Sequence, residues 1–409
     1  MNRAAGTAVA PSMTMVLLAA TLAQVASAMG IAVFPVIAPQ LAMLLDVDAS
    51  LVGYQISILY GGALLSSPFV GTIVLRWGAC RAMQWACWLA ASGMVLALFG
   101  WLWLMPIGAM LIGFSNALAA AGAAHILFRF GTAQNRNLVF SIKQAGVPLG
   151  WAGIALLAPV LAVQIGWRAP MLLVLAYSAG CALWLERFRP YWDDDRDPGA
   201  ASRTSLFAGA QLLWRYPVLR YLSVAAFFFS FVQLCLGAFT VNLLVQEVGY
   251  SLVAAGAMLS VVQVSGMCGR MLFGWLADRA GNAVTVLLVT NVVAGLCCAL
   301  ALLLPMGWPL MLLVVFYIVF GLTGYGWNGI MHAQIARLSP PGMVSVTTGG
   351  MMMWVFAGIL IGPSLFATVY RGTGSYVLTY GGVSLVAAAG AAFVWLAMRK
   401  AALSQEQAA

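Results

Sequence analysis

The chain is a succession of long apolar runs, separated by short segments where charged residues, proline and glycine gather. A membrane-spanning helix needs about 20 apolar residues. Runs such as MLLVLAYSAGCALWL lack the strict alternation that a membrane β-barrel requires. The pattern therefore predicts an all-α membrane protein. Its breaks predict twelve spanning helices, near residues 13–41, 50–74, 81–101, 104–129, 137–164, 168–186, 217–246, 250–276, 283–304, 308–335, 343–370 and 376–398.

Composition agrees with this pattern, since 63% of the residues are hydrophobic and only 7% are charged. The net charge of +9 raises the question of nucleic-acid binding, but the basic residues are scattered singly and form no patch. The 7 cysteines lie mostly inside apolar runs, without the spacing of a metal site. We therefore expect membrane lipids as surroundings, and no nucleic acid, metal or cofactor.

Basic residues also predict the topology. Arg168 and Arg371 alone fall on one side of the arrangement, Lys143 and Arg270 fall within spans, and the other basic residues lie on the opposite side. The positive-inside rule then places both termini in the cytoplasm, as expected for a multi-pass protein of a bacterial inner membrane.

The longest connection, 187–216, divides the spans six and six. We expect an N-terminal bundle (1–186), a cytoplasmic linker (187–216) and a C-terminal bundle (217–409). The linker's four aspartates resemble a metal site, but a solvated linker is the expected reading; they are Asp193, Asp194, Asp195 and Asp197. The stretch SLFAGAQLLWRY at its end predicts an interfacial amphipathic helix.

A short loop repeats at matching places in the two halves. The chain reads GTIVLRWGACR at 71–81 and GWLADRAGNAV at 274–284, so three residues recur 203 positions apart. The pairs are Gly71 with Gly274, Arg76 with Arg279, and Gly78 with Gly281. Such a repeat is typical of a transporter built from two related bundles.

With these features the whole chain resembles the major facilitator superfamily. The family's loop pattern Gly-x-Leu-Ala-Asp-Arg-x-Gly-Arg is matched from Gly274 to Gly281, whereas the first copy has Leu75 in place of the acid. Gly269-Arg270 and the stretch SIKQAGVPLGWAG (141–153) are similar to the branch that contains cyanate-permease-like, oxalate:formate and monocarboxylate transporters. The resemblance implies a monomeric secondary active transporter that works by alternating access.

The repeated loop predicts a conformational latch made by Gly274, Asp278, Arg279 and Gly281. A carboxylate is favourable at the positive start of a neighbouring helix. The resemblance implies that Asp278 holds the outward-facing state in this way. The alternative is an ordinary solvated acid, and with Leu75 in the first copy the equivalent latch must be weaker or made differently.

The spans contain cations but no mid-membrane carboxylate. The ten acids fall near the predicted ends of spans or in the linker. Arg270 lies about 12 Å inside the Asp278 boundary at 1.5 Å per residue, and Lys143 lies about 9 Å into span five. An ionisable residue inside a membrane is a functional candidate. The alternatives are snorkelling for Lys143 and a structural partner of helix-end carbonyls or Asp278 for Arg270.

Family resemblance places spans five and eight on opposite walls of the transport path, so that Arg270 and Lys143 would hold an anion between them. Arg offers a bidentate fork to a carboxylate, and Lys a point charge. Further candidates for the path are polar residues within spans: Gln24, Asn116, Gln233, Asn242, Gln263, Tyr325 and Asn328. Each could instead form a helix-to-helix hydrogen bond. His125 and His332 are candidate proton relays, with structural roles as the alternative.

These residues predict a transporter of a small organic anion, coupled by symport or antiport, with protons as a candidate coupling ion. The alternative within the fold is a proton-coupled exporter of drugs or neutral solutes, which would usually need the missing mid-membrane carboxylate. A membrane-embedded enzyme or a transport-inactive sensor are alternatives of another class. No catalytic motif supports an enzyme.

The topology predicts that a single cysteine placed in the linker is protected from a membrane-impermeant thiol reagent in intact cells. The same cysteine should react after permeabilisation, because the linker lies on the cytoplasmic side. Labelling in intact cells would contradict this arrangement.

The latch predicts that Asp278→Asn shifts the resting population inward and slows turnover, because an amide cannot supply the anionic charge that favours a helix start. Accessibility of external-cavity cysteines and turnover rates would measure this. Wild-type accessibility together with wild-type turnover would rule the latch out.

Overall fold

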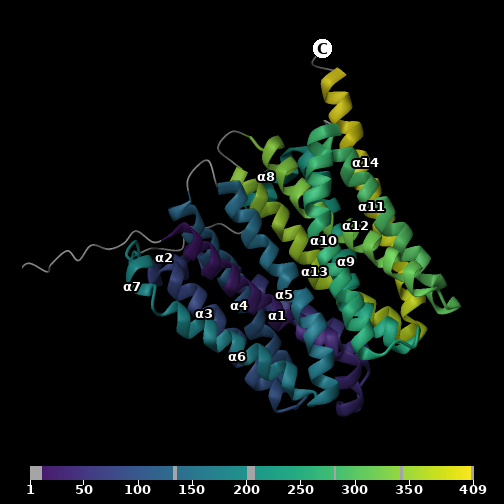
Figure 1. The fold of residues 1–409 in the computed structure, drawn as a ribbon. Helices are drawn as coiled ribbons and strands as arrows, with labels where there is room; N and C mark the ends of the chain where they lie inside the picture. Colours follow the sequence, from purple (N-terminus) through teal and green to yellow (C-terminus); the bar gives the residue numbers. More distant parts are fainter. Residues whose placement is uncertain (1–11, 132–135, 200–207, 281, 341–343, 407–409) are drawn as a thin grey trace, which may run out of the picture. The chain divides into compact units, whose positions relative to one another are not determined.

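The computed structural model describes residues 12–131, 136–199, 208–280, 282–340 and 344–406 (Figure 1). These residues form long helices and no strand, which confirms the all-α prediction. The long helices are α1 (Met13–Leu45), α2 (Val52–Trp77), α3 (Ala79–Leu98), α4 (Leu104–Phe130), α5 (Arg136–Gln164), α6 (Arg168–Leu185), α9 (Pro217–Gln246), α10 (Leu252–Ala280), α11 (Ala283–Leu300), α12 (Leu310–Leu338), α13 (Val344–Thr373) and α14 (Tyr376–Glu406). The short ones are η1 (Ala49–Leu51), α7 (Arg189–Trp192), α8 (Ala208–Arg215) and η2 (Ala301–Met306).

Within the described residues, 11 helices are long and apolar enough to cross a membrane. The long helix outside that set is α3, whose Arg81 and Gln84 lower its mean hydropathy. The chain is thus an integral, multi-pass membrane protein. Its helices begin and end within a few residues of the predicted spans in most cases.

Several helices continue past their predicted ends. α10 runs to Ala280 and α14 to Glu406, whereas the sequence pattern ended them at 276 and 398. Asp278 and Arg279 therefore lie in the last turn of α10, not in a loop. Charged residues mark where a helix leaves the apolar layer, but they do not break the helix itself.

Contacts divide the chain into two compact units, while the division into bundles at 1–186 and 217–409 stays a prediction. The first unit comprises 1–31, 61–151 and 168–204, and the second comprises 32–60, 152–167 and 205–409. The helices α1, α2 and α5 each contribute residues to both units.

Helix α3 is central to the first unit, where it packs against α4 and α6 (Figure 1). Glycine allows the close approach to α4: a Cβ atom at Gly122 would lie 2.9 Å from the carbonyl oxygen of Ala79. Alanine and cysteine side chains fill much of the interface, including Ala82, Ala86 and Cys87. Small residues of this kind are what helix association in a membrane requires.

The linker begins with an ordered clasp, so the expectation that all its aspartates are solvated is wrong. Asp193 is 6% exposed. Its carboxylate accepts hydrogen bonds from the backbone N–H groups of Cys80 (2.7 Å) and Arg81 (2.9 Å), at the start of α3. Gly78 has φ 97°, and a Cβ there would lie 2.1 Å from the carboxyl carbon of Asp193. Glycine is therefore required beside this cap.

The neighbouring aspartates fix the clasp to the end of α4. Arg129 forms ion pairs with Asp194 (2.7 Å) and Asp195 (3.0 Å), and His125 contacts Asp195 at 2.9 Å. The backbone N–H of Asp197 donates to the carbonyl oxygen of Leu75 (2.8 Å). Free N–H groups at a helix start need an acceptor, and the first copy of the repeated loop contains no acid to supply one. The linker supplies it.

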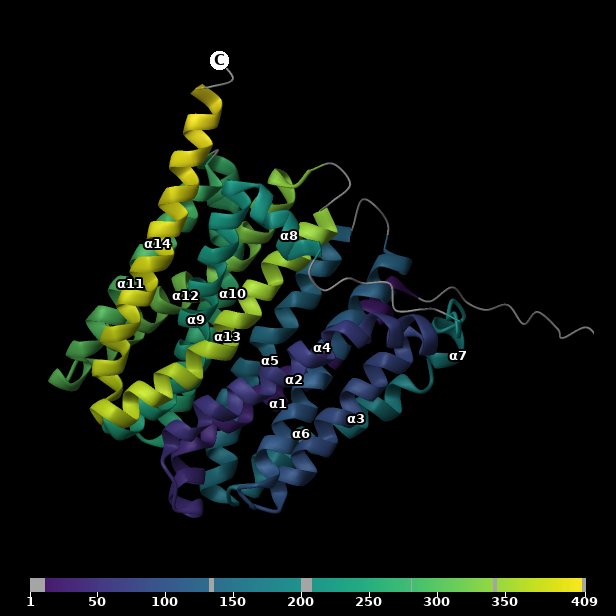
Figure 2. The ribbon, with the colours of Figure 1, turned by 180° about the vertical axis from the view of Figure 1, so that it is seen from behind.

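In the second unit α10 packs closely on α12, and α9 on α13 and α14, while α11 and α14 lie side by side in both views (Figures 1 and 2). The α14 start is capped by Glu247, whose carboxylate accepts the backbone N–H groups of Tyr376 and Val377.

Parts of α2 and α5 that belong to this unit are tied to it by polar contacts: the Tyr54 hydroxyl lies 2.7 Å from that of Thr368, and the Ser260 hydroxyl donates to the carbonyl of Ala152 at 3.0 Å. Asn242 donates to the carbonyl of Ala49 (3.2 Å).

The clasp predicts that Asp193→Ala lowers the free energy of unfolding by about 1–2 kcal/mol, the usual cost of losing a helix N-cap. Asp193→Asn should be milder, because its amide oxygen still accepts one N–H. Asp194→Ala is the matched control, since the Asp194 side chain is 60% exposed and its ion pair contributes little. Melting temperatures in detergent would measure the series. Equal melting temperatures for Asp193→Ala and Asp194→Ala would contradict the cap.

Candidate functional site

Arg270 lies on the face of α10 that packs against α12. The glycines around it bring the two helices together: a Cβ at Gly266 would lie 2.6 Å from Cβ of Tyr325, and one at Gly269 would lie 2.4 Å from the carbonyl oxygen of Leu322. Arg270 itself is half-buried. Its Nε is buried and has no hydrogen-bond partner, and no ion pair joins it to a carboxylate within the described residues.

Gln263 and Tyr325 form a buried pair beside Arg270. The Nε2 of Gln263 donates to the hydroxyl oxygen of Tyr325 at 2.9 Å, so the Tyr325 O–H remains able to donate elsewhere. Tyr325 is an electrostatic neighbour of Arg270. Tyr60 on α2 is also an electrostatic neighbour of Tyr325, and it was not among the sequence candidates. The signal that could have identified Tyr60 from the sequence is its position, because it is a tyrosine inside a predicted span.

The other polar candidates of the second unit are hydrogen-bonded from helix to helix. The Oε1 of Gln233 on α9 accepts from Trp327 Nε1 (2.9 Å) and from Asn328 Nδ2 (2.8 Å) on α12. Trp327 was not predicted from the sequence. One turn further along α12, the ring of His332 contacts the backbone carbonyl of Asn328 through Nδ1, at 2.7 Å.

Lys143 is the buried cation of the first unit. The residue is only 5% exposed. The Nζ donates to the amide oxygen of the adjacent Gln144 at 3.2 Å, and no described carboxylate forms an ion pair with it. Gly146, one turn away, faces α1, because a Cβ there would lie 3.2 Å from Thr21. A lysine that snorkels keeps its ammonium group in water at the membrane surface, so the burial of Lys143 does not favour that alternative.

Gln24 and Asn116 join α1 to α4. The Nε2 of Gln24 and the hydroxyl of Ser27 both donate to Asn116 Oδ1, at 3.3 and 3.2 Å. Gln24 and Asn116 thus form the helix-to-helix hydrogen bond that was the alternative to a role in the transport path. The Oε1 of Gln24 is nevertheless buried and lacks a partner. Ser27 was missed by the sequence reasoning, because one serine in an apolar run carries no distinguishing signal.

His125 lies away from these residues, in the clasp with Asp195. This contact supports the structural role of His125, whereas a proton relay by His125 stays a prediction.

The latch expected around Asp278 also stays a prediction. Asp278 and Arg279 are exposed, Arg279 lies over the ring of Trp275 at 5.4 Å, and Gly281 lies outside the described residues.

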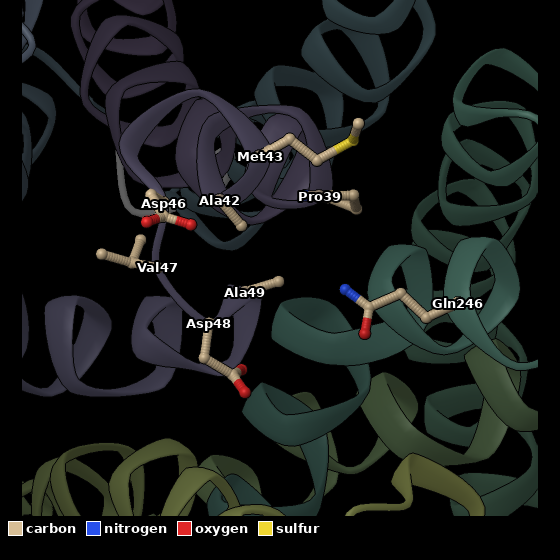
Figure 3. A pocket seen from close by; sticks show the side chains of 8 residues that line it. All are labelled: Pro39, Ala42, Met43, Asp46, Val47, Asp48, Ala49 and Gln246. Carbon is tan, nitrogen blue, oxygen red and sulfur yellow. The ribbon is translucent and has the colours of Figure 1, made fainter.

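A cavity of about 400 Å³ lies apart from these candidates, at the end of α1 (Figure 3). Figure 3 shows the carboxylates of Asp46 and Asp48 on one side and the amide of Gln246 reaching from α9. The Asp48 carboxylate already accepts the N–H of Ser50, at 2.7 Å. Acidic walls without a cation do not suit an anion, so the cavity does not belong with Arg270.

The structure thus brings together Arg270, Gln263, Tyr325, Asn328 and His332 on α10 and α12, with Gln233 attached through Asn328. It brings Gln24 to Asn116 in the first unit. Lys143 and His125 have contacts of their own, and the joint use of Lys143 and Arg270 stays a prediction.

Comparison with known proteins agrees with this architecture. The chain is 28% identical to monocarboxylate transporter 13 of Rattus norvegicus over 334 residues, 79% of this chain and 75% of that protein. It is 28% identical to monocarboxylate transporter 11 of Homo sapiens over 338 residues, 77% of this chain and 68% of that protein.

A bacterial homologue of the human lysosomal transporter Spinster, solved in an inward-facing and occupied conformation, has the same fold. Its TM-score is 0.74 at 16% identity, over 95% of this chain and 97% of the other. The family model for the Major Facilitator Superfamily matches residues 20–363. The relatives are transporters, not enzymes. The chain therefore belongs to the Major Facilitator Superfamily and is a transporter of that kind.

Proposed function

We propose that the protein transports a small organic anion, a monocarboxylate or dicarboxylate, by alternating access. The observation that carries the proposal is the presence of two cations within membrane-spanning helices, Arg270 and Lys143, neither of which is paired with a described carboxylate. The names of the monocarboxylate transporters, to which the chain is 28% identical, support the same substrate class.

Electrostatics gives the reason. A charge inside an apolar layer is costly unless a counter-charge or hydrogen bonds compensate it. Arg270 keeps its charge at all relevant pH values. A carboxylate that entered would supply the counter-charge and could accept two N–H groups of the guanidinium fork.

Tyr325 adds orientation to this site. Its oxygen already accepts the Gln263 amide, and this leaves the O–H as a donor for a second substrate oxygen. Because α10 and α12 approach through glycines, the guanidinium and the phenol are held by one rigid helix pair. Pre-organised donors of this kind reduce the entropy lost on binding.

The site predicts that Arg270→Lys weakens carboxylate binding by at least about tenfold even though the charge is kept, because the bidentate geometry is lost. Lys143→Arg should have a smaller effect if Lys143 acts as a point charge. Calorimetry with purified protein and three anions, pyruvate, L-lactate and succinate, would measure both. Arg399→Lys is the matched control, since Arg399 is an exposed arginine near the end of α14, outside the latch and the anion site.

Uptake of the same radiolabelled anions into sealed proteoliposomes would complete the test. Wild-type affinity in folded Arg270→Ala and Lys143→Ala proteins would overturn the anion site. A preference of the wild-type protein for organic cations over these anions would also overturn it, and would favour a drug exporter of the same fold.

A further inference from the structure

We infer that the second unit binds the phosphate headgroups of anionic phospholipids at the end where α9 begins and α14 ends (Figures 1 and 2). Two sites carry the inference: Arg220 with the rings of Trp214 and Tyr221, and Arg399 with the ring of Trp395. We call these two sites the arginine–aromatic rim. The inference does not depend on the proposed substrate site.

The first site joins α8 to the start of α9. The guanidinium carbon of Arg220 lies 5.5 Å from the ring centre of Trp214 and 5.2 Å from that of Tyr221. Trp214 is itself held in place, because its ring stacks on that of Trp354 on α13 at 6.4 Å. A guanidinium that lies against aromatic rings is oriented by them and keeps its N–H edge available to a phosphate. The site therefore presents a donor fork in a fixed direction.

The position of Arg220 within α9 also favours a nearby anion. Arg220 lies in the first turn of this helix, which begins at Pro217. The start of a helix carries a partial positive charge, so a cation there is disfavoured unless an anion offsets it. Within the described part of the chain no carboxylate forms an ion pair with Arg220. A headgroup phosphate would supply that anion.

The second site lies on the exposed face of α14. The guanidinium carbon of Arg399 lies 4.6 Å from the ring centre of Trp395. Leu378 and Leu385, nearer the start of the helix, are 55% and 73% exposed. From Leu378 to Arg399 the helix rises about 30 Å at 1.5 Å per residue, which is the thickness of the hydrocarbon core. A leucine at one edge of the apolar layer thus places Trp395 and Arg399 at the other edge, where the headgroups begin.

An arginine of the first unit shows the contrast. Arg129 also lies over an aromatic ring, yet it forms ion pairs with Asp194 and Asp195. Neither Arg220 nor Arg399 has such a partner among the described residues. The positive-inside rule accounts for basic residues at the end of a span, but not for their support by aromatic rings without a counter-charge. An anionic lipid accounts for both features.

A phospholipid fits the arginine–aromatic rim better than a soluble anion does. Trp214 and Trp395 are 58% and 46% exposed. Tryptophan is enriched at the membrane surface, where its ring meets acyl chains and its N–H meets the polar layer. The guanidinium fork beside it matches a phosphate group bidentately. The occupant is therefore amphipathic as well as anionic, and phosphatidylglycerol has this chemistry.

Native mass spectrometry of the full chain in detergent tests the inference. The protein is mixed with equal amounts of phosphatidylglycerol and phosphatidylcholine that carry the same acyl chains. We expect the wild type to retain phosphatidylglycerol preferentially. The double variant Arg220→Gln/Arg399→Gln should lower this preference at least roughly fivefold, as expected for basic residues at an anionic surface. An excess of inorganic phosphate should not displace the lipid, because it lacks acyl chains.

Two further variants separate the arginine–aromatic rim from net charge. Arg337→Gln is the matched control, because Arg337 is exposed near the end of α12 and lies over no ring of the described residues. It should leave the lipid preference unchanged. Trp395→Leu keeps every charge but removes the ring under Arg399, and should weaken retention at that site roughly two- to fivefold. Trp395 and Arg399 are exposed, so Trp395→Leu and Arg399→Gln test the inference even if the double variant does not fold.

Three outcomes would overturn the inference. Equal retention of the two lipids by the wild type would show that no anionic lipid is selected. An equal loss in Arg337→Gln and in the double variant, with no loss in Trp395→Leu, would reduce the preference to net charge. Displacement of the lipid by inorganic phosphate would assign the sites to soluble anions.

Discussion

The need to compensate charge in a chain that is almost entirely apolar governs much of this structure. Only 10 of the 409 residues are acidic, so each carboxylate is a scarce counter-charge. Several of them satisfy helix starts: Asp193 caps α3, Glu247 caps α14 and Asp48 caps η1. Asp194 and Asp195 pair with Arg129.

This distribution leaves the cations inside the spans without a counter-charge from the described residues. Burying a cation is costly, and a neighbouring carboxylate would remove that cost but also the affinity for an anion. Arg270 and Lys143 have amide, phenol and glycine neighbours instead. The absence of a partner is thus consistent with a site completed by its substrate.

The sequence predicted the all-α class, the long helices and the family, because hydrophobic length and charge position depend on the bilayer and little on tertiary detail. It also placed Arg270, Gln263 and Tyr325 in spans that the structure brings together. It missed the clasp, because nothing local in the run DDDRD shows that Asp193 meets a helix start more than a hundred residues earlier. It ended α10 too soon, because Asp278 was taken as the end of a helix and not of the apolar layer.

Glycine packing connects the electrostatics to transport. Gly266, Gly269 and Gly326 let α10 and α12 approach so closely that Arg270, Tyr325 and His332 are held on one helix pair. Arg270 keeps its charge at all relevant pH values. An empty site therefore still holds one uncompensated cation, and its movement through the membrane should be slower than movement of the loaded site. The same electrostatics that gives affinity for an anion thus also favours exchange of one anion for another over return of the empty carrier.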